Sequence, residues 1–412
     1  MIEDVGRRAR AASRRLAELT ASGKNAVLEE MASRLEAQAP LILEANASDL
    51  EEAGAQRVAG ALLDRLRLDE GRVASMAAGL RKVAALPDPV GELTGGWRMY
   101  NGVQLERRRV PLGVVAVIYE ARPNVTADAA ALCLKSGNAV ILRGSSYALR
   151  SNLAIGELLR QAASHQGVPE DAVQVVRDTT REGARALMQA KHWVDLLVPR
   201  GGPSLIAAIE SEATVPYVLD GAGNCHVYVD QSADLDEALG IVVNAKAQRP
   251  GVCNAAETLL VHEAVAAKFL PVVSEALAAE GVEMRGDEAA RSLAPGMGTA
   301  TDEDWATEYL DLILAVRVVP DLEAALDHIR SYGSGHTEAI VAEDLRAAES
   351  FVRGTDSAVV MVNASTRFTD GEEFGFGAEI GISTQKLHVR GPMGLEALTT
   401  ERYVLRGEGQ VR

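Results

Sequence analysis

The run Gly113-Val114-Val115-Ala116-Val117-Ile118-Tyr119 decides the fold, because it opens a series of short apolar runs that alternate with helical segments. The other runs of this series lie at residues 139–142, 173–176, 194–198 and 225–229. Apolar strands separated by helical stretches are typical of a parallel sheet built from βαβ units. The sequence therefore predicts an α/β domain in this region.

A second series of apolar runs lies further along the chain, near residues 258–261, 312–319, 339–341 and 359–362. Helical segments again separate these runs. The same argument predicts a second α/β domain with its own parallel sheet.

Helices and a hairpin are predicted before the first sheet. The first 90 residues carry apolar side chains at helical spacing, so we expect helices that pack onto the sheet. Around residues 97–109 the pattern changes to alternation, and Asn101-Gly102 is a typical two-residue hairpin turn. A hairpin as charged as this one is expected to project from the body of the protein.

Length, charge and cysteine content limit the possible functions. A chain of 412 residues is too long for one compact core and suggests two or three domains. Its 42 basic residues against 58 acidic ones give a formal charge of −16, which opposes binding to nucleic acids and anionic membranes. No signal peptide or run of about 20 apolar residues is present, so no membrane association is expected. Three cysteines without paired spacing favour a cytoplasmic protein without a metal site.

Cys253 is the first candidate for chemistry. It lies in the segment QRPGVCNAAET (248–258), where Pro250 and Gly251 must end a helix and present the thiol from a loop. Lys246 and Arg249 are close in sequence, and nearby cations favour the nucleophilic thiolate. Locally, a small hydrophobic residue that fills a gap in the core is an equally good interpretation.

The other two cysteines are weaker candidates. Cys133 lies within an apolar stretch, which predicts a buried and inert thiol. Cys225 precedes His226, a possible base, and this pair would make the protein a thiol hydrolase. Adjacent residues on a strand point to opposite faces, however, which argues against that pairing.

Two turns between a strand and a helix are suited to binding anions. The first includes Arg143 and Ser145, and the second includes Gly202 and Ser204. Each offers amide groups at a helix start, together with hydroxyl groups and a cation. We expect the two turns on adjacent strands of one sheet, where they predict a dinucleotide site at the carboxyl edge. Each turn alone is also explained as a simple helix cap.

Four segments resemble the aldehyde dehydrogenase superfamily. They are YEARPNVT (119–126), LKSGNAVILRG (134–144), QRPGVCNA (248–255) and GHTEAI (335–340). The resemblance extends from about residue 109 to the C-terminus, and the four segments occur in the order of the superfamily. It implies an α/β fold with two parallel-sheet domains and a small β excursion for oligomerisation.

The resemblance is closest to the branch that reduces γ-glutamyl phosphate with NADPH. It implies that the products are glutamate-5-semialdehyde and phosphate, that the reaction passes through a cysteinyl thioester, and that it is the second step of proline biosynthesis. It further implies a homo-oligomer, with glutamate 5-kinase as the supplier of the labile substrate. The alternative is a hydrolytic or CoA-acylating semialdehyde dehydrogenase on the same fold.

The resemblance also assigns roles to catalytic and cofactor-binding residues. Cys253 matches the nucleophile, and Asn124 matches the side chain that forms the oxyanion hole with the cysteine amide. Glu308 matches the glutamate that holds the nicotinamide ribose. Arg143 stands where a lysine binds the adenosine ribose, and an arginine suits the 2'-phosphate of NADPH.

Two further assignments concern water and the substrate. Asp220 aligns with the glutamate that activates water in hydrolytic members, and this shorter acid in a glycine-rich turn favours phosphate over water as the acyl partner. The segment with Ser365, Thr366 and Arg367 lies where related enzymes bind the amino-acid end of the substrate, and Arg367 is expected to pair with its carboxylate.

The resemblance implies three functional regions. Residues 1–95 and 112–235 are expected to form the cofactor-binding domain. Residues 236–384 are expected to form the catalytic domain that carries the nucleophile. Residues 96–111 and 385–412 are expected to supply the oligomerisation hairpin and the C-terminal strand.

Overall fold

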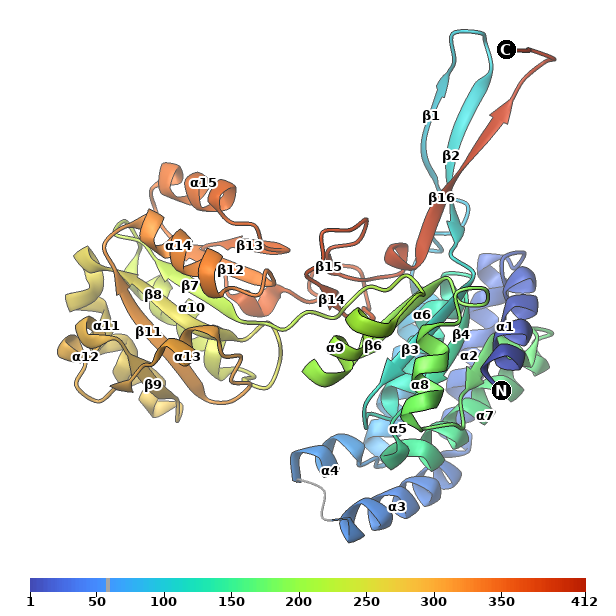
Figure 1. Ribbon diagram of the computed structural model, residues 1–412, viewed down its shortest axis with the longest axis horizontal. Coiled ribbons are helices and arrows are strands. Elements are labelled where there is room, and N and C mark those ends of the chain that lie inside the picture. The colour runs from blue at the N-terminus through green and yellow to red at the C-terminus, as the bar shows by residue number, and fades with distance from the viewer. Residues whose placement is uncertain (57–59) are drawn as a thin grey trace. The chain divides into compact units, whose positions relative to one another are not determined.

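Residues 1–56 and 60–412 are described by a computed structural model, in which backbone contacts divide the chain into two units (Figure 1). Unit 1 comprises Met1–Leu219, Phe376–Gly381 and Met393–Arg412. Unit 2 comprises Asp220–Gly375 and Ile382–Pro392. The division falls earlier in the chain than the expected boundary at residue 235.

Unit 1 is built on a parallel sheet of order β5-β4-β3-β6. Its strands are β3 (Val114–Tyr119), β4 (Ala139–Arg143), β5 (Val173–Val175) and β6 (Leu196–Arg200). Every residue of β3 is buried, as expected for a central strand of a sheet that is covered on both faces. The expectation that β4 and β6 are adjacent is wrong, because β3 lies between them. The order of strands along the chain differs from their order in the sheet. The connection after β5 returns past β4 and β3 and places β6 on the other side of β3.

Helices cover both faces of this sheet. Helices α6 and α7 contact each other and α2, and helix α1 contacts α8. The connections through α6 and α7 run in one direction along the sheet and the connection through α8 runs back. Right-handed crossovers therefore place α8 on the opposite face from α6 and α7. The helices of unit 1 are α1 (Ile2–Leu16), α2 (Ala21–Ala37), α3 (Ala39–Ala55), α4 (Gly60–Leu66), α5 (Glu70–Ala85), α6 (Asn124–Lys135), α7 (Leu149–His165), α8 (Arg181–Met188) and α9 (Pro203–Glu212). Short 3₁₀ turns lie at Ser146–Ala148, Glu170–Ala172 and Glu396–Leu398.

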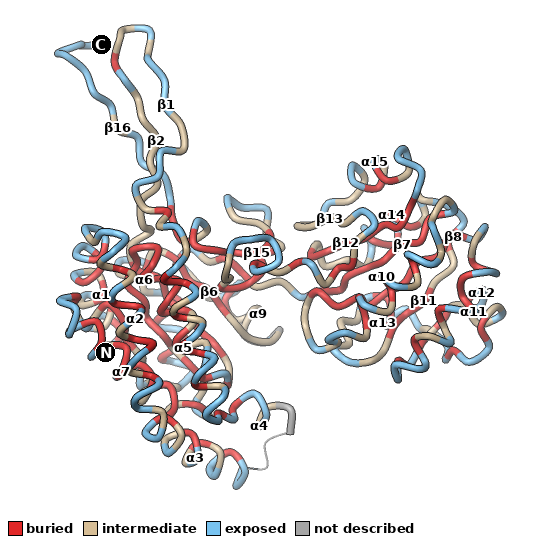
Figure 2. The backbone as a smooth tube through the Cα atoms, turned by 180° about the vertical axis from the view of Figure 1, so that it is seen from behind, coloured by how far each residue is buried: buried red, intermediate tan, exposed pale blue. Residues whose placement is uncertain are grey.

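A three-stranded antiparallel ribbon, which we call the arm, extends from the rest of unit 1 (Figure 1). It consists of β1 (Leu93–Arg98), β2 (Gln104–Pro111) and β16 (Thr399–Arg406), with β2 in the middle. The predicted turn is present, and Gly102 has a φ of +89°, which a glycine adopts without strain. Figure 2 shows how little of the arm is buried in comparison with β6.

Unit 2 contains a seven-stranded parallel sheet of order β10-β9-β11-β8-β7-β12-β13. Its strands are β7 (Cys225–Val229), β8 (Ala256–His262), β9 (Glu283–Gly286), β10 (Gly298–Thr299), β11 (Ile313–Val319), β12 (Thr337–Val341) and β13 (Val359–Val362). A separate two-stranded sheet pairs β14 (Ile382–Ser383) with β15 (Gly391–Pro392). The predicted second sheet is therefore present, together with two short strands, β9 and β10, that the apolar pattern did not indicate.

Two hydrophobic cores lie on the two faces of this sheet. Alternate residues of β7 supply them, with Val227 and Val229 in one core and Tyr228 in the other. The helices of unit 2 are α10 (Leu235–Ala247), α11 (Glu263–Ala279), α12 (Glu288–Leu293), α13 (Asp302–Ala306), α14 (Leu322–Tyr332) and α15 (Leu345–Gly354), with a 3₁₀ turn at Thr366–Phe368. The first core packs against α10 and α11, and the second against α14 and α15.

One strand assignment is corrected by this topology. The sequence analysis places residues 225–229 with the first sheet, but β7 pairs with β8 and β12 in unit 2. Alternation of strands and helices identifies a strand without identifying its sheet, and the chain passes from unit 1 to unit 2 at Leu219–Asp220 without a long linker. In the described parts of the chain, no helix has the length and apolar character that a membrane crossing requires.

Candidate active site

The segment of residues 248–255, here called the Cys253 loop, connects α10 to β8. Helix α10 ends at Ala247, just before the Pro250-Gly251 pair that predicts its end. Cys253 is half-buried, whereas Cys133 and Cys225 are buried, and none of the three forms a disulfide. Among the cysteines, only Cys253 is thus partly accessible.

The backbone of Cys253 packs tightly against two neighbours. A Cβ atom added to Gly223 would lie 1.6 Å from the Cys253 carbonyl oxygen, so only glycine fits there. The Sγ atom of Cys225 lies 3.1 Å from the same oxygen and donates to it. Burial raises the pKa of Cys225 well above its usual range, and the charges of Glu338 and Cys253 add to the shift. Cys225 is therefore a neutral thiol that supports the Cys253 loop.

The Cys225–His226 pair predicted for a thiol hydrolase does not form. His226 places its Nδ1 atom 2.8 Å from the Oε2 atom of Glu338, and both side chains are fully buried. The histidine near Cys225 is His336, whose Nδ1 atom lies 3.7 Å from the sulfur. Burial lowers the pKa of His336 to about 4, which makes it a weak base.

Arg367 is a cation whose charge interacts with that of Cys253. The buried ammonium group of Lys246 forms an ion pair with Glu257. The effects of Lys246 and Arg249 on the Cys253 thiol stay predictions. The pKa of Arg367 is lowered by burial and by the charge of Arg249, and the charges of Asp370 and Cys253 offset part of this shift. Since electrostatic coupling is mutual, the Arg367 guanidinium favours the Cys253 thiolate.

The segment with Ser365, Thr366 and Arg367 lies against the Cys253 loop. The Asn254 amide donates to the carbonyl oxygen of Arg367 at 3.4 Å and to that of Thr369 at 2.8 Å. The Nε atom of Arg367 donates to Gln248 at 2.8 Å. The Ser365 hydroxyl caps the 3₁₀ turn, and the buried Thr366 hydroxyl has no hydrogen-bond partner.

Glu308 also belongs to this cluster. It follows α13, and its Oε1 atom accepts a hydrogen bond of 2.7 Å from the Gly223 amide. Burial raises the pKa of Glu308 above its usual value. Glu308 is therefore hydrogen-bonded to Gly223, the glycine that packs against Cys253.

Asp220 has a structural partner within unit 2. Its Oδ1 atom accepts a hydrogen bond of 2.8 Å from the Ile382 amide, and the Gly221 amide donates to the Ile382 carbonyl oxygen at 2.9 Å. This arrangement is typical of a residue that fixes a turn.

Asn124 is the first residue of α6 in unit 1, and it is exposed. Its side-chain amide donates to the Oδ2 atom of Asp128 at 2.9 Å. Burial raises the pKa of Asp128 to about 6, although the hydrogen bond from Asn124 and the charge of Arg200 oppose the shift. One N–H group of Asn124 is thus held by a carboxyl group on the next helical turn.

The second anion turn of unit 1 already holds a carboxylate. The Gly202 amide, at the start of α9, donates to the Oε1 atom of Glu120 at 2.7 Å. Ser204 is exposed on the first turn of the same helix. The amide is therefore engaged by a side chain of unit 1, and the dinucleotide site expected at this turn stays a prediction.

The first anion turn makes similar internal contacts. The Nη2 atom of Arg143 donates to the carbonyl oxygens of Thr179 and Thr180 at 2.6 and 3.0 Å, while its buried Nε atom has no hydrogen-bond partner. Burial lowers the pKa of Arg143. The Ser145 hydroxyl accepts from the Tyr147 amide, at the 3₁₀ turn that precedes α7.

Comparisons with known proteins agree with these features. Residues 1–313 match the model of the aldehyde dehydrogenase family. A γ-glutamyl phosphate reductase of Moorella thermoacetica is 57% identical over 411 residues, covering 100% of this chain and 98% of that protein. The crystal structure of γ-glutamyl phosphate reductase from Thermotoga maritima superposes with a TM-score of 0.97 at 46% identity, covering 99% of both chains. The chain belongs to the γ-glutamyl phosphate reductases of the aldehyde dehydrogenase family.

This family assignment confirms the resemblance and the fold class predicted from the sequence. More distant solved structures share the fold alone. An engineered glycolyl-CoA reductase with bound NADP⁺ matches with a TM-score of 0.69 at 17% identity, covering 98% of this chain and 96% of that one.

Three residues that surround the predicted site residues were missed by the sequence analysis. Glu257 is an acid within an apolar strand, which is a recognisable sign of a buried, paired charge. Gly223 belongs to a glycine-rich turn, but nothing in the sequence shows which residue it contacts. Glu120 lies far from Gly202 in sequence, so no local signal predicts their hydrogen bond.

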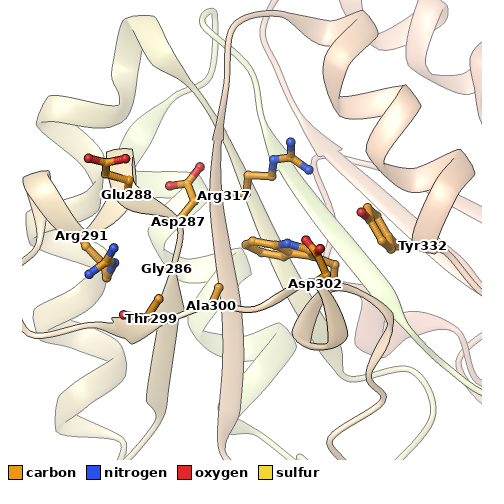
Figure 3. Close-up of a pocket in the computed structure, with 10 residues that line it drawn as sticks. Gly286, Asp287, Glu288, Arg291, Thr299, Ala300, Asp302, Arg317 and Tyr332 are labelled. Carbon is orange, nitrogen blue, oxygen red and sulfur yellow. The ribbon is translucent and has the colours of Figure 1, made fainter.

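A pocket of about 320 Å³ lies elsewhere in unit 2 (Figure 3). Its walls combine basic, acidic and aromatic side chains, and they include none of the site residues predicted from the sequence. The lining residues are Gly286, Asp287, Glu288, Arg291, Thr299, Ala300, Asp302, Trp305, Arg317 and Tyr332. Asp287 already caps α12, and this mixture of charges selects no single class of ligand.

Proposed function

We propose that the chain reduces γ-glutamyl phosphate with NADPH and releases glutamate-5-semialdehyde and phosphate, as the second step of proline biosynthesis. The observation that carries the proposal is the Cys253 loop, which presents the one partly accessible thiol beside the Arg367 guanidinium. The relatives named γ-glutamyl phosphate reductase, at 53–57% identity over nearly the full length, support the choice of substrate.

In the first step, the Cys253 thiolate attacks the acyl carbon of γ-glutamyl phosphate. A carbon–sulfur bond forms, the bond from carbon to the phosphate oxygen breaks, and phosphate leaves. The result is a thioester, which divides one difficult reduction into two easier steps. We propose that the Asn124 amide and the Cys253 backbone amide donate to the oxyanion, where each fixed donor stabilises the developing charge by roughly 3 kcal/mol.

The residues of unit 1 fit a phosphorylated dinucleotide. The Gly202 amide already binds a carboxylate, so it is an anion site, and Arg143 has a buried Nε atom without a partner. We propose that Arg143 and Ser145 bind the ribose 2'-phosphate, and that Gly202 and Ser204 bind the pyrophosphate. NADPH, when bound, supplies the hydride.

The remaining assignments concern positioning. We propose that Glu308 binds the nicotinamide ribose, and that Ser365, Thr366 and Arg367 bind the glutamyl end of the substrate. The contact of this segment with the Cys253 loop supports the second assignment. When the oxyanion of the thiohemiacetal collapses, the carbon–sulfur bond breaks, the aldehyde leaves and the Cys253 thiolate is restored.

A hydrolytic reaction has less support. Hydrolysis of the thioester requires a base for water, and the candidate Asp220 is engaged with the Ile382 amide. The CoA-acylating alternative remains as an outcome of the assay.

One assay tests the function. Glutamate-5-semialdehyde and NADP⁺ are incubated with the protein, with or without inorganic phosphate or CoA. We expect NADPH to appear only with phosphate, and not with Cys253→Ala. Oxidation that needs CoA, or neither additive, would assign one of the alternatives instead.

We further propose a cytoplasmic homo-oligomer that receives its substrate from glutamate 5-kinase. The arm supports the oligomer, because Trp97, Tyr100 and Tyr403 are exposed there. Trp97→Glu is expected to lower the mass measured by light scattering, and an unchanged mass would contradict this role of the arm.

A further inference from the structure

The base of the Cys253 loop is closed by a buried ion pair. Lys246 lies in the last turn of α10 and Glu257 near the start of β8, so the two residues flank the loop. Their side chains are fully buried, and the ammonium group contacts the Oε2 atom of Glu257. The pair therefore joins the end of the helix to the start of the strand.

The second oxygen of Glu257 reaches another segment. Its Oε1 atom accepts a hydrogen bond of 3.2 Å from the Leu310 amide. Leu310 has a φ of +54°, a left-handed conformation that leucine rarely adopts and that its surroundings must hold. The neighbouring Tyr309 ring lies beneath the Lys246 ammonium group, 5.9 Å from the ring centroid.

Glu308 precedes these two residues in the chain. It connects their segment to the Cys253 loop. It accepts from the Gly223 amide at 2.7 Å, and Gly223 packs against the carbonyl group of Cys253. A displacement of Leu310 would therefore move Glu308 and, through Gly223, the Cys253 loop.

We propose that Lys246 and Glu257 are positioning residues, which hold Glu308 and Cys253 in one fixed arrangement through the Leu310 amide. The cofactor role of Glu308 rests on the proposed function. The pair itself touches no substrate. Its functional part is the Glu257 acceptor. Burial raises the pKa of Glu257 to about 7, and the Lys246 ammonium group opposes this shift and orients the acceptor.

Two double variants separate positioning from stability. K246M/E257Q removes both charges but keeps an oxygen acceptor for the Leu310 amide. K246M/E257M removes the charges and the acceptor at similar volume, and replacing a buried ion pair with apolar side chains is often tolerated. We expect the KM for NADPH to stay within about twofold in the first variant, and to rise roughly three- to tenfold in the second, the effect of one hydrogen bond. The value of kcat should change less than KM.

A second readout needs no cofactor. Alkylation of Cys253 by iodoacetamide, followed by peptide mass spectrometry, should change in rate at least about threefold in K246M/E257M and little in K246M/E257Q. If the wild-type protein alkylates normally but reduces nothing, the proposed function fails while the alkylation rates still test the pair. If both variants match each other in KM and in alkylation, the pair is only structural and the proposal is overturned.

A matched control is Lys24→Met, because Lys24 forms a comparably buried ion pair with Asp88 in unit 1. It should lower the melting temperature without changing the alkylation rate of Cys253. If the double variants do not fold, the hydrogen-exchange rate of the Leu310 amide in the wild-type protein tests the proposal instead. The residue is exposed, yet the bond to Glu257 should protect its amide, and rapid exchange would overturn the proposal.

Discussion

The proposed site residues of unit 2 and those of unit 1 are held in different ways. The backbone of Cys253 packs against Gly223, and its carbonyl oxygen accepts from the Cys225 thiol. In unit 1, Asn124 and Gly202 each bind a carboxyl group of their own unit. The contacts around the proposed nucleophile are thus already formed, whereas the Gly202 amide would have to exchange Glu120 for the proposed cofactor. Preorganisation favours rate, and exchange makes affinity adjustable.

Removal of the nucleophile should have the largest effect. Cys253→Ala is expected to lower kcat at least roughly 10⁴-fold, because no other group in the proposed mechanism forms the thioester. Stopped-flow measurement of NADPH oxidation checks this expectation. Cys133→Ala, which alters a buried thiol of unit 1, is the control and should keep its activity. Substantial activity in Cys253→Ala would show that Cys253 is not the nucleophile, and the comparison between the two units would fail.

Loss of the proposed oxyanion donor should have the second largest effect. Asn124→Ala is expected to lower kcat about 10²- to 10³-fold with little change in KM, because its hydrogen bond matters most in the transition state. Steady-state kinetics distinguish the two constants. Asn244→Ala, on the exposed surface of α10, is the matched control. A rise in KM alone would mean that Asn124 only binds substrate.

The carboxyl group that holds Asn124 predicts a dependence on pH. The pKa of Asp128 is raised from 3.8 to about 6, so the group stabilises the folded protein while it is protonated. This contribution is present below about pH 4 and is lost as the pH rises through 6. Asp128→Asn stays neutral, so its stability relative to wild type should increase by on the order of 2 kcal/mol between pH 4 and pH 7. Denaturant titrations at several pH values measure this difference, and parallel curves would contradict it.

The smallest expected effect is a gain in affinity for NADPH. Glu120→Gln removes the charge that competes for the Gly202 amide, so the KM for NADPH should fall roughly two- to fivefold. Glu182→Gln, an exposed substitution on α8, serves as the control. A higher KM would show that Glu120 assists the cofactor, and the exchange of partners proposed for unit 1 would then be wrong.

The residues that were predictable are those whose signal is local. The strands β3 and β8 follow from apolar runs, the hairpin from Asn101-Gly102, and the exposure of Cys253 from Pro250-Gly251. The burial of Lys246 also has a local signal. It follows Ala238 and Val242 at intervals of four, so helical geometry places it on the buried face of α10.

Other features depend on contacts between distant parts of the chain. The pairing of β7 with β12, and of Gly202 with Glu120, joins residues whose neighbours in sequence say nothing about the partner. Register and sheet membership come from tertiary packing, which competes with and often overrides local preference. The family resemblance supplied the remaining roles, because no local pattern distinguishes Asn124 or Glu308 from ordinary surface residues.

The arm has a consequence for the order of folding during synthesis. Strand β2 pairs along its whole length with β16, which lies at the other end of the chain. The ribosome must synthesise residues 112–398 before this pairing can form, so the nascent hairpin exposes an unpaired edge throughout that interval. Its many arginines, including Arg107, Arg108 and Arg109, are the kind of side chain that discourages edge-to-edge aggregation during that interval.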